Sequence, residues 1–268
     1  MAGLCFLFRL VGENNVKKLV QVGTGLLVAL LLLAVFDTIV FDTVEQDTEY
    51  SLGKKARILF QFNNPDHQKV LNHPTKPVRK LPDKCIDALV ESMQKFITIN
   101  VGGISANQVG EPLQLFLLAA PPAVNSSTPA EVFINPVITH VSDDKVCFWH
   151  GCLSAKGQPF GKTATWKEIT IQAQDAGGNT FTRDLKGLDA IVAQHEFRHL
   201  LGGGYHEHAN EFYEEMELMQ RIFQKKERFL EACDDDAPFL LSDYQPGERI
   251  QDFAKRTGIS SSKPEKRP

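Results

Sequence analysis

The run Gln194-His-Glu-Phe-Arg-His199 constrains the fold more than any other part of this chain. It lies in an apolar stretch, Leu188 to Leu201, that ends at three glycines, a typical stop signal for a helix. Two histidines four residues apart lie on one face of a helix, about one turn from each other. Both imidazoles can then reach one metal ion, and Glu196 can hold a water molecule beside it. The pattern predicts a buried central helix that supplies two ligands of a metal site.

A metal site of this kind needs a third protein ligand, with a further position open for water. Metzincin peptidases would place a histidine at Tyr205, but His206 and His208 come one and three residues too late. Gluzincin peptidases would use a later glutamate, and the candidates are Glu214, Glu215 and Glu217. The remaining candidate is Cys152, far upstream in His150-Gly-Cys-Leu-Ser154. From the residues alone, all three choices stay open.

Strands and helices are both predicted around this helix. The segment Ile169–Gln174 alternates as a half-buried strand does, and Asp175–Asn179 is a hairpin turn. The apolar runs Leu113–Ala120 and Val132–Pro136 have the length of strands. Residues Pro82 to Ile99 are predicted to form a helix. Its core-facing side chains recur at helical spacing, and they include Ile86, Leu89, Val90 and Met93.

After the central helix, residues Asn210 to Ala232 are predicted to form a second long helix. Its apolar face is expected to pack against a sheet. The residues of that face are Phe212, Met216, Met219, Phe223 and Leu230. Residues 233–268 are rich in Asp, Pro, Ser and Lys, so we expect a flexible tail there. The globular domain is thus predicted at residues 55–232.

The composition is that of an ordinary globular protein, with 43% hydrophobic and 23% charged residues among 268. This length suits one or two domains. The formal net charge of −4 argues against a general nucleic-acid binder, and no direct nucleic-acid binding is expected. The 5 cysteines are few and widely spread, which is not a disulfide framework. Four of them are expected to be buried or idle thiols: Cys5, Cys85, Cys147 and Cys233.

The first 54 residues are predicted to lie outside the globular domain. The run from Leu19 to Phe36 carries no charge and is just long enough to span a bilayer as a helix. Basic residues precede it and acidic ones follow it, which places residues 1–18 on the cytoplasmic or matrix side. We expect a membrane anchor at residues 19–41 and a linker at residues 42–54. The alternatives are a cleaved signal segment, an organelle import segment and a buried globular helix.

Three motifs follow one another along the chain: Gly103-Ile-Ser-Ala-Asn-Gln108, His150-Gly-Cys-Leu-Ser154 and Gln194-His-Glu-Phe-Arg-His199. Their order and spacing resemble the peptide deformylase family, which has G-[IL]-[AS]-A-x-Q, E-G-C-L-S and Q-H-E-x-D-H. The strand segment Ile134-Asn-Pro136 also matches that family. The resemblance covers about residues 57–230. It implies a deformylase-like α+β fold with antiparallel sheets packed around the central helix.

The resemblance also implies roles for single residues. Cys152, His195 and His199 would bind one divalent ion, Fe²⁺ or Zn²⁺, with the cysteine as thiolate. Glu196 would take a proton from water at the ion and pass it to the leaving amine. The Gln108 amide and the Leu153 backbone N–H would donate to the developing oxyanion. The residues expected to touch the peptide backbone or the methionine side chain are Gly103, Ile104, Ile191 and Val192.

The chain departs from the family pattern beside the ion. His150 stands where the family usually has glutamate, and Arg198 where it usually has aspartate. An arginine often found on the strand after the cysteine motif has no counterpart around Ala164 and Thr165. Groups behind the ligands orient them and tune the metal. We therefore expect His150 to act either as a neutral hydrogen-bond partner or as a fourth ligand that closes the site.

The expected function is removal of the N-formyl group from N-formylmethionyl peptides, with release of formate. One alternative is a deformylase-like protein with an altered substrate or lost activity. Another is a membrane-anchored zinc metallopeptidase. The ribosome is an expected partner, and the membrane another through residues 19–41. Formylated chains arise in bacteria, mitochondria and plastids, so a mitochondrial location is expected, with other organelles and the plasma or ER membrane as alternatives. Charge asymmetry alone would place the domain across the membrane from the ribosome.

Overall fold

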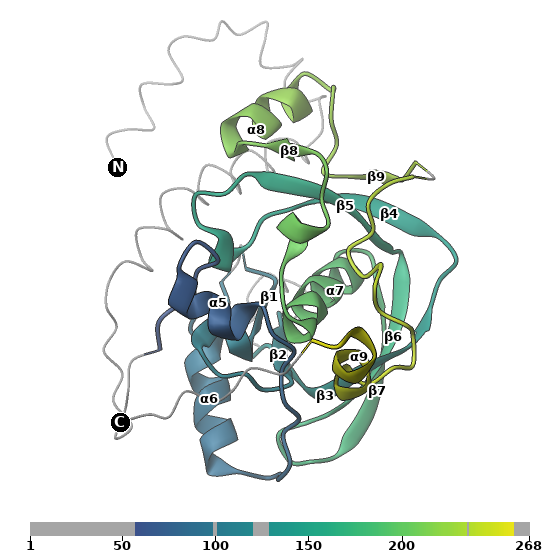
Figure 1. Ribbon diagram of the computed structural model, residues 1–268. Coiled ribbons are helices and arrows are strands. Elements are labelled where there is room, and N and C mark those ends of the chain that lie inside the picture. The colour runs from purple at the N-terminus through teal and green to yellow at the C-terminus, as the bar shows by residue number, and fades with distance from the viewer. Residues whose placement is uncertain (1–56, 99–100, 120–128, 235, 260–268) are drawn as a thin grey trace, which may run out of the picture. The chain divides into compact units, whose positions relative to one another are not determined.

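The computed structural model describes residues 57–98, 101–119, 129–234 and 236–259 (Figure 1). Its helices are α5 (Pro65–Leu71), α6 (Lys84–Gln94), α7 (Leu188–Leu201), α8 (Glu215–Phe223) and α9 (Ile250–Thr257). Its strands are β1 (Gly103–Ser105), β2 (Leu115–Leu118), β3 (Glu131–Val141), β4 (Lys145–His150), β5 (Phe160–Trp166), β6 (Glu168–Gln174), β7 (Thr180–Lys186), β8 (Phe212–Tyr213) and β9 (Leu230–Ala232). Single 3-10 turns are η2 (Ala106–Val109), η3 (Leu153–Ala155) and η4 (Tyr205–Glu207).

The strands form two antiparallel sheets, as the α+β prediction requires. A 5-stranded sheet has the order β1-β2-β3-β6-β7, and a 4-stranded sheet has the order β8-β5-β4-β9. Strands β6 and β7 form the predicted hairpin, in which the Asp175 carboxylate accepts a hydrogen bond from the Asn179 N–H at 2.9 Å. Because Asx side chains close turns in this way, the register of the hairpin follows from its sequence.

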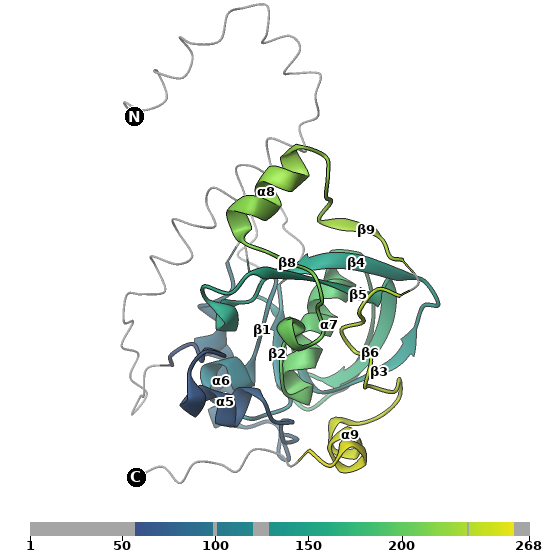
Figure 2. The same ribbon diagram turned by 45° about the horizontal axis from the view of Figure 1, so that its top comes forward.

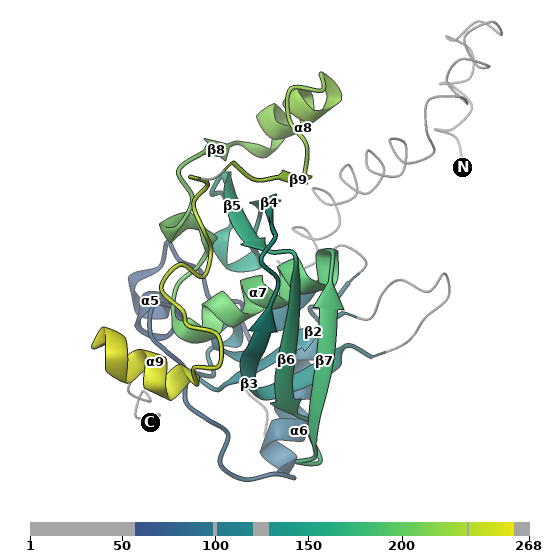
Figure 3. The same ribbon diagram turned by 90° about the vertical axis from the view of Figure 1, so that its right-hand side faces the viewer.

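Helix α7 lies between the two sheets and is buried on nearly every side (Figure 3). Its apolar residues Phe197, Leu200 and Leu201 are fully buried in the main core. Gln194 fixes the helix to the second sheet, because its side-chain amide exchanges hydrogen bonds with the backbone of Trp166 at 2.8 and 2.9 Å. Burial on all sides means that every polar group of α7 needs a partner inside the protein.

Helix α6 is the predicted helix near residues 82–99, but it is shorter and ends at Gln94. The Asp83 side chain caps it by accepting a hydrogen bond from the Cys85 N–H at 2.7 Å. Its buried face consists of Ile86, Leu89 and Met93, as the helical spacing indicates. This face covers β1 and β2 through a second core cluster, which also holds Ile104.

The predicted long helix at residues 210–232 is wrong. The segment instead forms β8, then α8, and then β9 beside β4. Helix α8 ends where Lys225 takes a positive φ of 57°, and the chain then turns back into the second sheet. Most of the face expected to pack on a sheet is exposed, with Met216 at 76% and Phe223 at 64%. The apolar spacing along these residues fits one helix, but the structure has a short helix between two edge strands. Apolar spacing alone therefore gave the wrong prediction here.

The predicted flexible tail at residues 233–268 is wrong for its first part. Residues Leu240, Leu241, Ile250 and Phe253 are fully buried in the main core, and α9 lies beside α7 (Figure 2). The Tyr244 ring packs edge-on against Phe197, with 4.9 Å between their centroids. The segment is polar on average, and its composition therefore predicted a flexible tail. The few apolar side chains within it nevertheless pack into the main core. The globular domain thus continues to residue 259 of the described chain.

Cys147 and Cys233 form a disulfide, which corrects the expectation of idle thiols at these positions. The link spans 86 residues, with 5.1 Å between the two Cα atoms. It forms because β9 pairs with β4, so that Glu231 lies opposite Cys147 and residue 233 comes close. Cysteine spacing in the sequence does not reveal strand pairing. Cys85 and Cys152 are free cysteines.

The predicted membrane anchor at residues 19–41 and the linker at residues 42–54 lie outside the described residues. Within the part of the chain that the structure describes, no helix is long and apolar enough to cross a membrane.

Candidate active site

Cys152, His195 and His199 come together although the cysteine and the first histidine are 43 positions apart in the sequence. The Cys152 Sγ lies 3.2 Å from the His199 Nε2, and that Nε2 lies 3.2 Å from the His195 Nε2. Three ligands at about 2.0–2.3 Å from one tetrahedral ion lie roughly 3.4 Å from one another. Among the described residues, this group has a geometry that fits one ion, and it favours the cysteine over the later glutamates as third ligand.

Two backbone features position the three side chains. His195 and His199 are one turn apart on α7, whose burial fixes their positions. Cys152 lies between the end of β4 and η3, in extended backbone with φ −147°. Residue 151 needs to be a glycine in this backbone position, because an added Cβ would lie 2.7 Å from the Phe160 ring. Strand β4 and helix α7 thus meet at the ligand atoms.

The second ring nitrogen of each histidine contacts a different group. The Nδ1 of His199 lies 2.9 Å from the Gly203 carbonyl oxygen, which accepts its hydrogen. The Nδ1 of His195 lies 3.1 Å from the Nδ1 of His150. These contacts leave both Nε2 atoms free to face the ion, as metal-binding histidines require. His150 lies behind His195, so it is a hydrogen-bond partner and not a fourth ligand.

The imidazole of His150 is neutral in this setting. Burial lowers its pKa well below the ordinary value, and the neighbouring His195 lowers it further. It packs nearly parallel to His195, with 5.3 Å between the ring centroids. Its Nε2 is buried without a hydrogen-bond partner among the described residues. The family usually has a glutamate at this position, which carries a negative charge. Histidine here therefore removes one negative charge from beside the candidate metal site.

The thiol of Cys152 is held by several donors. Burial raises its pKa, and the nearby Glu196 raises it further. The backbone N–H groups of Ser154 and Ala155 and the side chain of Gln108 act in the opposite direction. The Gln108 Nε2 lies 3.4 Å from the sulfur. These donors suit a thiolate, the form in which cysteine binds a metal.

Glu196 is 3% exposed, and its Oε2 is buried without a hydrogen-bond partner among the described residues. Burial raises its pKa to about 8, while a hydrogen bond from Ser105 acts in the opposite direction. Gly103 leaves room for this side chain, because an added Cβ would lie 2.7 Å from the Glu196 Cγ. An unpartnered carboxylate oxygen beside three ligand atoms is suited to bind water or a substrate group.

Gln108 is the third residue of η2, and its side chain is fixed by Ser105. Its Oε1 accepts hydrogen bonds from the Ser105 N–H at 2.9 Å and the Ser105 hydroxyl at 3.0 Å. Its Nε2 therefore faces Cys152 and Ser154, at 3.4 and 3.1 Å. Ser105 thus contacts both Gln108 and Glu196, a role that the sequence motif alone did not indicate.

The residues predicted to contact the substrate lie around the start of α7 and on β1. Ile104 and Ile191 are buried, at 0% and 1% exposure. Val192 is half-buried and lies against Gly102, where an added Cβ would be 3.0 Å from its Cγ2. Leu153 begins η3 directly after the cysteine ligand, and its carbonyl oxygen accepts a hydrogen bond from Gln61 at 2.9 Å. A substrate role for them stays a prediction.

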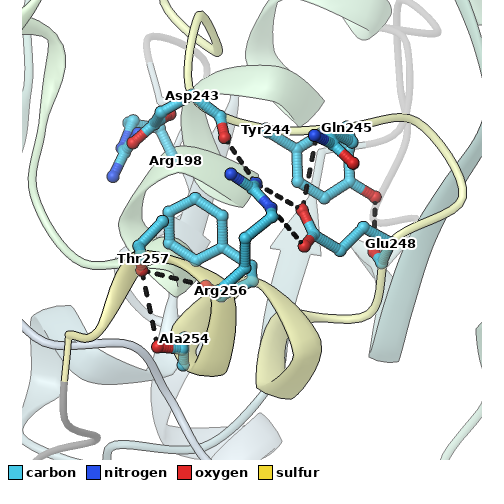
Figure 4. A network of polar contacts seen from close by, with 9 residues as sticks. Arg198, Asp243, Tyr244, Gln245, Glu248, Ala254, Arg256 and Thr257 are labelled. Atoms are coloured by element: carbon cyan, nitrogen blue, oxygen red, sulfur yellow. Dashed lines mark hydrogen bonds and ion pairs between the residues drawn. The ribbon is translucent and has the colours of Figure 1, made fainter.

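Arg198 is 2% exposed and makes an ion pair with Asp243 at 2.7 Å (Figure 4). Its other terminal nitrogen donates to the Gly202 carbonyl oxygen at 2.8 Å. The positive charge that Arg198 brings beside His199 is therefore balanced by a carboxylate. Sequence reasoning missed Asp243, because it lies in the segment that was expected to be a flexible tail.

The comparisons with known proteins agree with this geometry. The family model "Polypeptide deformylase" matches residues 60–215. The chain is 33% identical over 152 residues to "Peptide deformylase 1" of Prochlorococcus marinus, with 54% of this chain and 76% of that protein covered. It is 32% identical over 158 residues to "Peptide deformylase" of Chloroflexus aggregans, with 54% and 83% covered.

A solved structure has the same fold. The peptide deformylase from Synechococcus elongatus in complex with actinonin has a TM-score of 0.50 and 24% identity, with 63% of this chain and 85% of that chain covered. Asp243 and α9 lie beyond the residues that the family model matches. Because the model matches more than half of the chain, and with it all three motifs, the chain belongs to the peptide deformylase family.

Proposed function

We propose that this chain is a metal-dependent hydrolase that removes the formyl group from N-formylmethionyl peptides and releases formate. One observation carries the proposal. A cysteine sulfur and two histidine nitrogens lie within 4.8 Å of one another, beside a buried glutamate with an unpartnered oxygen. Relatives named peptide deformylase, at about a third identity, support the same reaction.

The donor set fits a divalent transition metal. One thiolate and two imidazoles are ligands that both Fe²⁺ and Zn²⁺ accept. Binding of an ion would favour the Cys152 thiolate and so offset the effect of burial on the pKa of this thiol. An ion held there would supply a Lewis acid for the formyl oxygen and would lower the pKa of water from 15.7 to about 7. We infer that Cys152, His195 and His199 hold one such ion.

Glu196 is the proposed acid and base. Burial raises its pKa to about 8, towards neutral pH, where a group both accepts and releases protons well. Glu196 would accept a proton from the attacking water and deliver it to the peptide nitrogen as the bond to the formyl carbon breaks. Its unpartnered Oε2 is the atom available for that transfer.

Gln108 and Leu153 are the proposed oxyanion donors. The Gln108 Oε1 is held by Ser105, and its Nε2 donates to the Cys152 sulfur and the Ser154 hydroxyl, so a developing oxyanion would compete with these two acceptors for its hydrogens. The Leu153 N–H is the first of η3, directly after the cysteine. Removal of one donor of this kind typically costs about 2.7–4 kcal/mol of transition-state stabilisation.

The substrate backbone is proposed to pair with β1. Among the described residues, this strand lies at the edge of the 5-stranded sheet, with β2 as its neighbour on one side. An extended peptide can add to such an edge by main-chain hydrogen bonds. Gly103 and Ile104 lie on this strand, next to Glu196. The methionine side chain would lie against Val192 and Ile191 at the start of α7.

A second candidate is a deformylase-like protein with an altered substrate or reduced activity. His150 favours it, since a neutral imidazole replaces the carboxylate that usually supports the first histidine ligand. A carboxylate partner raises the basicity of a ligand histidine, and loss of such a partner typically costs 10–100-fold in metal affinity or activity.

We also propose a membrane-anchored protein in mitochondria that meets formylated chains near the ribosome. The uncharged run at residues 19–36 supports the anchor. The proposed substrate supports the mitochondrial location, because formylated chains are made in mitochondria. Protease protection of the full-length chain in isolated mitochondria would test both the location and the side of the membrane.

The function is tested by formate release from formyl-Met-Ala-Ser. The full-length protein is purified without oxygen and loaded with Fe²⁺, and Glu196→Ala serves as control. The proposal requires formate release that depends on the metal and on Glu196. Release no faster than that of the control would contradict it and would favour the second candidate.

A further inference from the structure

Arg198 connects the C-terminal segment to the metal site. One end of its guanidinium group forms the ion pair with Asp243, which lies between β9 and α9 (Figure 4). The other end donates to the Gly202 carbonyl oxygen at 2.8 Å. Because the guanidinium group is planar and rigid, fixing one end also fixes the other.

The carbonyl held by Arg198 belongs to the turn that orients a metal ligand. Gly202 and Gly203 end α7 with positive φ values of 88° and 117°. The Gly203 carbonyl oxygen, one residue further on, accepts the Nδ1 hydrogen of His199 at 2.9 Å. Two successive glycines have no side chains to restrict their backbone, so this turn needs contacts from outside to keep one geometry.

Asp243 is itself held in place by a network. Its backbone carbonyl oxygen accepts a hydrogen bond from Arg256 at 2.7 Å, and Arg256 forms an ion pair with Glu248 at 2.7 Å. The Tyr244 hydroxyl donates to the Glu248 carbonyl oxygen at 2.7 Å. Figure 4 shows these groups around α9, whose Phe253 is buried in the core. These contacts hold the backbone of Asp243, while its carboxylate, 35% exposed, is held by the ion pair with Arg198.

Other charged groups near Arg198 do not replace this pair. Glu207 and His208 lie close enough for Arg198 to lower the pKa of each, but burial is the first cause of their shifts. Among the described residues, the ion pair recorded for Arg198 is the one with Asp243. The residues that match the family model end at 215, so the counter-charge for Arg198 comes from outside them.

We propose that Asp243 is a positioning residue for the metal site. Acting through Arg198, it holds the Gly202–Gly203 turn and with it the hydrogen bond that orients the His199 ring. The inference rests on the proposed metal site and assigns to the C-terminal segment a role in metal binding. Groups behind metal ligands typically change metal affinity by 10–100-fold when they are removed.

The test compares Co²⁺ binding by the full-length chain and its variants. The readouts are the Co²⁺ dissociation constant from competition with a chelator, the visible absorption spectrum of bound Co²⁺, and the melting temperature. Asp243→Asn is expected to weaken Co²⁺ binding by about tenfold and to change the spectrum. Asp252→Asn is the matched control, because it breaks an exposed ion pair to Arg249 in the same segment. The control should bind Co²⁺ like the wild type.

A double variant covers the case in which Asp243→Asn fails to fold. Arg198→Met with Asp243→Asn removes both charges, leaves no unpaired guanidinium, and is expected to weaken Co²⁺ binding to the same extent. Wild-type affinity and spectrum in either folded variant would overturn the inference and leave the proposed function standing. A wild-type chain that binds no Co²⁺ would overturn the proposed metal site and the inference together.

Discussion

The Nδ1 of His150 lies 3.1 Å from the Nδ1 of His195, on the side of the ring away from the other metal ligands. When the His195 Nε2 binds an ion, its Nδ1 carries the hydrogen and donates it to His150. A neutral imidazole is a weaker acceptor than a carboxylate. The group behind His195 therefore carries less negative charge than the glutamate that the family usually has at this position.

His150→Glu is expected to strengthen metal binding by about tenfold and to raise kcat/KM, because a carboxylate makes the His195 imidazole more basic. Titration with Zn²⁺ against a chelator and the formyl-peptide assay measure the two effects. His150→Ala should change both in the opposite direction. If His150→Glu folds with unchanged metal affinity, the contact between the two rings does not tune the ion.

Gly103→Ala is expected to lower kcat by about a hundredfold or more, because general acid–base catalysis contributes typically 10²–10⁴-fold. The new Cβ would lie 2.7 Å from the Glu196 Cγ and 2.9 Å from its Oε1, so the carboxylate must move. Gly177→Ala in the β6–β7 hairpin is the control, because there a Cβ meets side-chain atoms at 3.1 Å. Steady-state kinetics of the two variants with equal metal content measure the effect. Unchanged kcat in Gly103→Ala would contradict the proposed acid–base role of Glu196.

Phe253→Ala is expected to lower the free energy of unfolding by about 3–5 kcal/mol, the usual cost of removing a buried aromatic ring. Phe253 is 0% exposed in the main core. Ile259→Ala, at a position with 37% exposure near the end of the described chain, should cost much less. Urea unfolding of both variants makes the comparison. Equal stability of Phe253→Ala and wild type would contradict a contribution of this segment to the core and would favour the flexible tail.

The stability of the protein should fall as the pH drops below about 6.5, in part because of His208. Burial, and to a smaller extent the charge of Arg198, lowers the pKa of His208 to about 4. Between the two pKa values the unfolded chain binds more protons than the folded one, so the free energy of unfolding decreases as the pH falls. His208→Gln should flatten this dependence between pH 6.5 and about 4. Urea midpoints across this range measure it, and identical slopes in His208→Gln and the wild type would contradict the assignment.

The sequence predicts those parts of the site that depend on local chemistry. The spacing of His195 and His199 requires one helix face, and the apolar residues around them require burial. The motifs that contain Gln108 and Cys152 supply the rest through the family resemblance. The helix at residues 82–99 and the hairpin at residues 175–179 follow from capping and turn residues in the same local way.

Other parts depend on which distant segments meet, and local patterns do not contain that information. Cys233 pairs with Cys147 because β9 joins β4, a pairing of strands far apart in the chain. Asp243 became visible as a partner only when the structure placed it against Arg198. The apolar spacing of residues 212–230 matched a helix, although β8 and β9 at its ends complete the second sheet. The anchor, the linker and the location stay predictions.

The central claim is that one thiolate and two imidazoles bind the same ion, and X-ray absorption at the metal edge of the Zn²⁺-loaded full-length protein tests it most directly. The account predicts one sulfur at about 2.3 Å and two imidazole nitrogens at about 2.0–2.1 Å. It also predicts that Cys152→Ser loses the sulfur contribution. A first shell without sulfur in the wild type, or the same sulfur signal in Cys152→Ser, would contradict the claim.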